Sequence, residues 1–197
     1  MADSKAGYGQ DLRPDLAAAL GNLGNGYSDV GRRADAVPPS EEAVALYRDL
    51  AAANPAHLPG LATALANLGI RYSDLGREAD AVAPAGEAVA LYRDLAAASP
   101  VHLPGLAHAL NNVGNCYRGV GRHAEAVPPA EETVTLYRDL AAASPAYFPG
   151  LADALTNLGT CYNKVGRRAE AILPAEEAVT LYREQAAASP AYLPASR

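Results

Sequence analysis

The chain has 197 residues, a formal net charge of −6 and a hydrophobic content of 50%, with only two cysteines. The apolar content excludes an intrinsically disordered chain, and the cysteine count excludes a disulfide-stapled scaffold. The acidic balance, with lysine only at Lys5 and Lys164, argues against non-specific nucleic-acid binding, because such binding depends on neutralising phosphates.

The first 15 residues, MADSKAGYGQDLRPD, form a leader without the apolar stretch of a secretory signal. No segment of the sequence reaches the roughly 18 uncharged apolar residues that a membrane helix needs. We therefore expect a cytoplasmic protein that makes no membrane contact, in which Cys116 and Cys161 stay reduced.

A 45-residue repeat follows the leader. The segment LATALANLGIRYSDLG, which starts at Leu61, occurs four times at this spacing with small changes. A period of this length is typical of stacked supersecondary units rather than of one globular core. We predict four units that together form one domain: residues 16–60, 61–105, 106–150 and 151–195.

Each unit is predicted to contain two helices. In the second unit, apolar residues from Leu61 to Leu75 recur on one helical face, and Gly76 follows as a stop signal. A further helix extends from Ala79 to Ala98 and ends at Ser99-Pro100. The intervening turn is so short that the helices must pack antiparallel. The predicted fold class is all-α: an α-solenoid of four helix-turn-helix repeats with eight main helices.

Prolines inside the second helices conflict with this regular pattern, because each removes a backbone donor and crowds the preceding turn. They occupy equivalent places in the four units: Pro39, Pro84, Pro129 and Pro174. We expect a kink or an irregular first turn just before them, near Val37, Val82, Val127 and Ile172.

The pattern resembles the tetratricopeptide repeat family. Repeat two supplies Leu65, the Leu68-Gly69 pair, the aromatic Tyr72 and the small Ala81 that this family's pattern requires. The unit is longer than the family's common 34 residues, and this form is similar to the repeats of kinesin light chain and of bacterial arrays attached to signalling modules. The resemblance implies a right-handed superhelix whose first helices line a concave groove for peptides or partner proteins. It implies no reaction.

One asparagine recurs in every unit, on the face of the first helix opposite Leu65: Asn22, Asn67, Asn112 and Asn157. Stacking should align these amides, hereafter the asparagine row, along the groove, where each can donate to and accept from a peptide backbone. Further groove candidates are Asn25, His108, Asn111, Asn115 and Arg118. An alternative stays open, in which the asparagines recur by duplication or bond a neighbouring helix.

We predict no catalytic site, cofactor or metal centre. Cys116 and Cys161 occupy equivalent places in successive units, and the spacing of packed helices, about 8–10 Å, is too wide for a disulfide. Neither thiol has a histidine at zinc-binding spacing. His108 precedes Cys116 by two helical turns, which is too far for a nucleophile–base pair within one helix.

Two functions fit the sequence. The first is a scaffold that binds a peptide or partner protein in the groove. The second is a structural or self-assembling module that acts through its ends, since Val179, Leu181 and Tyr182 are left without a following helix. In that case we expect either end-to-end association or a chain that is a fragment of a larger signalling protein.

Overall fold

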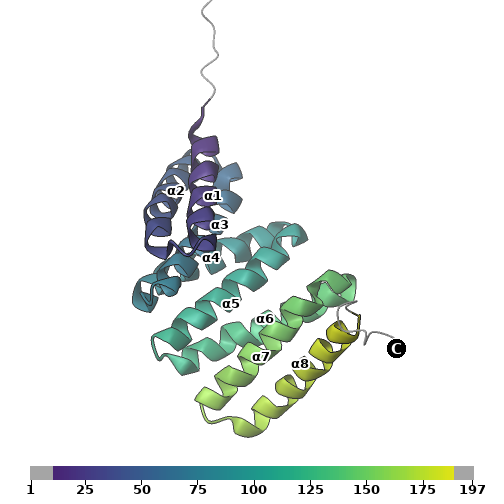
Figure 1. The fold of residues 1–197 in the computed structure, drawn as a ribbon. Helices are drawn as coiled ribbons and strands as arrows, with labels where there is room; N and C mark the ends of the chain where they lie inside the picture. The colour runs from purple at the N-terminus through teal and green to yellow at the C-terminus, as the bar shows by residue number, and fades with distance from the viewer. Residues whose placement is uncertain (1–10, 189–197) are drawn as a thin grey trace, which may run out of the picture.

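The computed structural model describes residues 11–188 and contains eight α-helices in that range, with no strand. The helices are α1 (Arg13–Asp29), α2 (Arg33–Ala53), α3 (Leu58–Asp74), α4 (Glu78–Ala98), α5 (Leu103–Gly119), α6 (His123–Ala143), α7 (Phe148–Lys164) and α8 (Arg168–Ala188). Figure 1 shows them as four antiparallel pairs stacked in chain order. The predicted all-α solenoid is confirmed. Residues 1–10 of the predicted leader and the last residues of the fourth unit lie outside the described range.

The turn inside each helix pair depends on a glycine with positive φ. Gly76 has a φ of 70°, a left-handed conformation that only glycine adopts without strain. The chain then reverses, and the backbone N–H of Arg77 donates to the carbonyl of Tyr72 over 2.9 Å. Equivalent glycines occupy the other turns: Gly31, Gly121 and Gly166. The predicted helix stop at Gly76 is therefore confirmed.

A single turn of 3-10 helix connects each pair to the next. These turns are η1 (Pro55–His57), η2 (Pro100–His102) and η3 (Pro145–Tyr147). Each begins with a proline at a position where the missing N–H costs no hydrogen bond. The following first helix starts at the next residue, so each connection is short and regular.

The second helices remain helical through their prolines. α4 passes through Pro84 without interruption, and its first turn is regularly bonded, from the Ala81 N–H to the Arg77 carbonyl at 3.1 Å. The irregular first turn that we expected is therefore absent from α4, whereas a bend near Val82 stays a prediction. Pro84 itself is buried, so its ring contributes apolar contact in place of the lost hydrogen bond.

The core lies within and between the pairs. Leu65 is fully buried, and the small Ala81 and Ala85 bring α4 close to α3. Complete burial of a leucine side chain stabilises the fold by about 1.5–3 kcal/mol. The first pair is less complete: Leu16 is 47% exposed, whereas its equivalent Leu61 is 6% exposed against the preceding pair. Each pair therefore relies on its neighbours.

Two helical glycines test how tightly neighbouring pairs fit. A Cβ at Gly105 would lie 2.3 Å from the Tyr92 ring of the preceding helix, whereas a Cβ at Gly86 would meet nothing within 4 Å. We expect Gly105→Ala to destabilise the fold by about 1–3 kcal/mol through overpacking. The matched Gly86→Ala should stabilise it by about 0.5–1 kcal/mol through helix propensity. Urea unfolding followed by circular dichroism measures both, and equal stabilities would contradict the expectation.

Candidate functional site

The first helices α1, α3 and α5 contact one another in order, and side-chain hydrogen bonds connect α5 to α7. Arg71 Nη2 donates to Asn25 Oδ1 over 2.9 Å, which joins α3 to α1. Asn157 Nδ2 donates to Asn111 Oδ1 over 2.9 Å and so joins α7 to α5. The structure therefore places several predicted groove residues side by side on one face, hereafter the first-helix face.

The asparagine row divides into two kinds of residue. Asn157 is engaged, since it bonds Asn111 and also accepts from Arg118 Nη2 at 3.4 Å. Among residues 11–188, Asn22, Asn67 and Asn112 make no side-chain hydrogen bond. The alternative that the row bonds a neighbouring helix thus describes Asn157, while the other three amides keep their donors and acceptors available.

A hollow of about 250 Å³ lies between α1 and α3 and includes three of the predicted residues. Asn22, Asn25 and Asn67 line it together with Tyr47. The other lining residues are small: Ala17, Ala18, Gly21, Gly60, Thr63 and Ala64. The hollow is therefore lined by amide groups and small side chains. A second chain could approach the helix backbones closely there.

Arg118 and His108 lie on the same face with different surroundings. The Arg118 guanidinium donates to Asn115 Oδ1 over 2.6 Å and has no carboxylate partner within the described part of the chain. His108 packs edge-on against Tyr137, with ring centroids 6.0 Å apart. At the equivalent place in the preceding pair, the hydroxyl groups of Thr63 and Tyr92 form a hydrogen bond of 2.9 Å. His108 thus has a packing contact, and its place in a binding site stays a prediction.

Sequence reasoning missed Arg71. Its side chain is only 11% exposed, and its guanidinium pairs with Asp74 at 3.3 Å besides the bond to Asn25. A buried charge needs such partners to offset its lost hydration. Comparison of equivalent positions in the sequence could have indicated Arg71, because the other units have Gly26, Cys116 and Cys161 there. A lone charge at a place otherwise filled by small residues indicates a local polar contact.

Neither cysteine belongs to a chemical site. Cys116 and Cys161 are free and buried, and burial raises the pKa of both thiols. Residues 11–188 contain no cluster of three or more His, Cys, Asp or Glu side chains placed to hold a metal ion. None of the helices in this range combines the length and apolar character needed to cross a membrane.

A second set of contacts joins neighbouring pairs on the side of the second helices. Tyr72 on α3 donates its hydroxyl to Glu41 Oε1 on α2 over 2.6 Å. Tyr162 on α7 makes the same bond to Glu131 Oε1 on α6 over 2.8 Å. Partial burial of the phenol, followed by the bond to Glu41, raises the pKa of Tyr72 to about 12. An arginine guanidinium, that of Arg77, lies 4.5 Å from the centre of the Tyr72 ring.

Ion pairs between successive second helices repeat with the same register. They are Arg48–Glu87 at 2.5 Å, Arg93–Glu132 at 2.5 Å and Arg138–Glu177 at 2.6 Å. All six side chains are about one third to one half exposed, and pairs of this kind contribute about 0–1 kcal/mol each. Their main effect is to fix how one pair sits on the next.

The paired helices, their glycine turns and their stacked order define an α-solenoid of repeats. The family model for the tetratricopeptide repeat matches residues 16–55, 61–97, 106–142 and 151–184. The chain therefore belongs to the tetratricopeptide repeat family, which is in general a protein-interaction fold.

Solved structures show the same architecture. The crystal structure of BtubC (BKLC) from P. vanneervenii is 21% identical, with a TM-score of 0.75, over 98% of this chain and 71% of that one. Aspartyl phosphate phosphatase F from Bacillus subtilis is 15% identical, with a TM-score of 0.70, over 93% of this chain and 43% of that one. MamA is 23% identical, with a TM-score of 0.61, over 89% and 84%. At these identities the likeness concerns the fold alone, and no curated protein sequence matches this chain.

The Tyr72–Glu41 contact predicts a loss of stability in alkali. The pKa of Tyr72 is about 12 in the fold and has an ordinary value of 10.0, so its stabilisation is complete below pH 10.0 and is lost as the pH rises toward 12. Tyr72→Phe should flatten this part of the pH profile of the unfolding free energy, measured by urea denaturation. The control Tyr27→Phe removes a tyrosine without a carboxylate partner among the described residues. Parallel profiles for wild type and Tyr72→Phe would disprove the assignment.

Proposed function

We propose that the chain is a scaffold that binds an extended segment of a partner protein along the first-helix face, in the groove that the family resemblance implies. The supporting observation is the division of the asparagine row, in which Asn22, Asn67 and Asn112 have no side-chain partner within residues 11–188. Asparagine is a poor helix former, so unpaired copies in mid-helix reduce stability unless another molecule uses them.

The spacing of the row suits a peptide backbone. Packed helices lie about 8–10 Å apart, and an extended chain advances about 3.3–3.6 Å per residue. A peptide crossing the first helices would therefore meet one row amide about every third residue. The amide can accept from a backbone N–H and donate to a carbonyl without reading the side chain. Selectivity would then come from Asn25, His108, Asn111, Asn115 and Arg118, which occupy positions that vary among the four units.

The proposal includes no catalytic step, cofactor or metal. We also propose a cytoplasmic location, because the two buried thiols suit a compartment that keeps cysteines reduced.

The test begins with peptides selected from a displayed random library on the immobilised chain, and measures their affinity by fluorescence anisotropy. Asn67→Ala combined with Asn112→Ala should weaken binding by about tenfold to a hundredfold. The reason is that two side-chain amides that bond the peptide backbone are lost. The variant should be at least as stable as the wild type in unfolding curves, since these amides have no partner in the fold and alanine is the better helix former.

The matched control is Arg93→Ala, which removes a surface ion pair on the side of the second helices. It should leave the affinity for the selected peptides unchanged. Equal binding by the double asparagine variant and the wild type would refute the proposed groove.

A second candidate function is end-to-end assembly, and the ion-pair register favours it. The three second-helix pairs join residues 39 apart. Arg183 on α8 is the next arginine of the series and Glu42 on α2 is its preceding acid, and neither has an ion-pair partner within the described range. If a second copy stacked on α8, Arg183 of the first copy would pair with Glu42 of the second.

Apolar exposure at both ends supports the same contact. Val179 is 46% exposed and Leu16 is 47% exposed, although their equivalents Val44 and Leu61 are buried. The contact between two copies would not match an internal contact fully. Asp15 is the equivalent of Gly60, and Gly60 lies against the ring of Tyr47 within the chain. A second copy would therefore sit slightly further out than an internal pair.

Sedimentation velocity at high protein concentration tests this assembly. Arg183→Glu should weaken self-association by at least about fivefold through like-charge repulsion, and adding Glu42→Arg to the same chain should restore it. Salt should weaken the wild-type contact. A strict monomer at all concentrations would rule the assembly out.

A further inference from the structure

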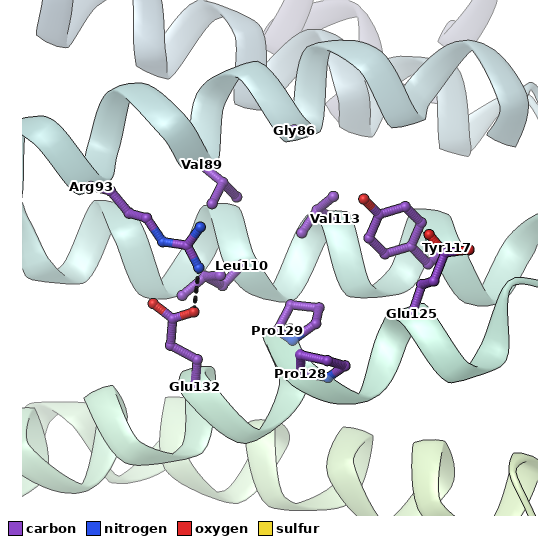
Figure 2. Close-up of a pocket in the computed structure, with 10 residues that line it drawn as sticks. All are labelled: Gly86, Val89, Arg93, Leu110, Val113, Tyr117, Glu125, Pro128, Pro129 and Glu132. Atoms are coloured by element: carbon purple, nitrogen blue, oxygen red, sulfur yellow. Dashed lines mark hydrogen bonds and ion pairs between the residues drawn. The ribbon is translucent and has the colours of Figure 1, made fainter.

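A pocket on the side of the second helices lacks a glutamate that its counterparts contain. It has a volume of about 380 Å³ and lies between α4, α5 and α6. Figure 2 shows the Arg93–Glu132 ion pair at one end and Tyr117 with Glu125 at the other. Its apolar lining consists of Val89, Leu110, Val113, Pro128 and Pro129, and Gly86 contributes from α4.

The residue at the Gly86 position is glutamate in the other three pairs: Glu41, Glu131 and Glu176. Glu41 accepts the Tyr72 hydroxyl and Glu131 accepts the Tyr162 hydroxyl, in both cases from the following pair. Tyr117 is the corresponding tyrosine that faces Gly86, and it has no hydroxyl partner within residues 11–188. One pair-to-pair junction thus keeps the phenol donor and lacks the carboxylate.

The cationic part of this arrangement is also retained. Arg167 Nη1 lies 3.4 Å from Glu131 Oε1 while the same guanidinium pairs with Glu170. At the junction that lacks the carboxylate, Arg122 lies 4.7 Å from the centre of the Tyr117 ring and pairs with Glu125. A carboxylate next to Tyr117 would therefore meet the same donor and the same cation that hold Glu131.

Packing does not explain the glycine. The φ of Gly86 is not positive, and a Cβ there would meet nothing within 4 Å. Glycine inside a helix is unfavourable by about 1 kcal/mol relative to alanine, so Gly86 weakens α4 without a steric reason. Its effect is to leave open the place that a glutamate side chain fills at the equivalent junctions.

We propose that this pocket binds an acidic side chain of a partner protein, on a surface separate from the first-helix face. The carboxylate accepts from the Tyr117 hydroxyl and faces Arg122, and its aliphatic stem rests on Val89 and Val113. Nearby Glu125 and Glu132 are each paired with an arginine, which offsets most of their repulsion of the incoming acid. Glu131 likewise binds Tyr162 and lies 3.4 Å from Arg167, although Glu170 pairs with the same guanidinium at 2.5 Å.

A partner side chain fits better than a free small acid. The pocket is open to solvent and supplies one hydroxyl and one shared guanidinium, which is little for a free ligand to offset its lost freedom. A glutamate presented on a protein surface gains further contacts from its flanking residues, and its methylene groups match the apolar lining.

The experiment titrates the full chain with a capped Ala-Glu-Ala peptide and follows the methyl NMR signals of Val89 and Val113. These signals should shift saturably, and capped Ala-Gln-Ala should bind at least about tenfold more weakly, because it lacks the charge. Tyr117→Phe should lose about tenfold. Equal binding of the two peptides would overturn the proposal, and so would acetate binding as tightly as the glutamyl peptide.

Two variants separate binding from folding. Gly86→Glu should restore the internal carboxylate and abolish the peptide-induced shifts, whereas Gly86→Ala should bind like the wild type. Glu131→Gly should open a second site, in which the methyl signals of Val134 also shift with the peptide. Peptide binding by Gly86→Glu at wild-type affinity would overturn the proposal. The Asn67→Ala and Asn112→Ala variant should bind the glutamyl peptide normally, so failure here is distinguishable from failure of the groove.

Discussion

Each helix pair buries its apolar face only when another pair stacks on it. Leu65 is fully buried and Leu61 is 6% exposed, yet Leu16 in the place equivalent to Leu61 is 47% exposed. The glycines Gly105 and Gly150 allow this contact, since each leaves room for a tyrosine ring of the preceding helix. Stability in such an array is the sum of weak units and strong interfaces. Every surface that we assign to binding is held in place by these interfaces.

Residues that join the pairs and residues proposed to bind partners follow different sequence patterns. Residues between pairs are constrained to repeat, because the same contact recurs at each junction. The units diverge at several positions of the first-helix face, and at the Gly86 position within one junction. The proposed groove rests on an asparagine that recurs in every unit, whereas the proposed pocket rests on a glutamate that is missing from one unit.

The repeat made most of the fold predictable. Helix ends at Gly76 and Ser99 followed from local signals, whose physical basis is a left-handed turn and a proline stop. The 3-10 turns and the regular first turn of α4 did not, because short turns depend on the packing of the next helix. Site prediction was weaker still. Helical periodicity placed Asn67 and Asn157 on one face, but it did not show that Asn157 bonds Asn111. Tyr117 without its acid becomes visible only when contacts across pairs are compared.

The exposed ends also determine how the molecule comes apart. Val179 and Tyr182 on α8 are more than 40% exposed, as is Leu16 on α1, while α3 to α6 are covered on both sides. Local opening therefore starts at the outermost helices and proceeds inward, so amide protons exchange most slowly in the middle of the array. A partner segment that crosses several first helices would fasten the fraying ends to this slow centre.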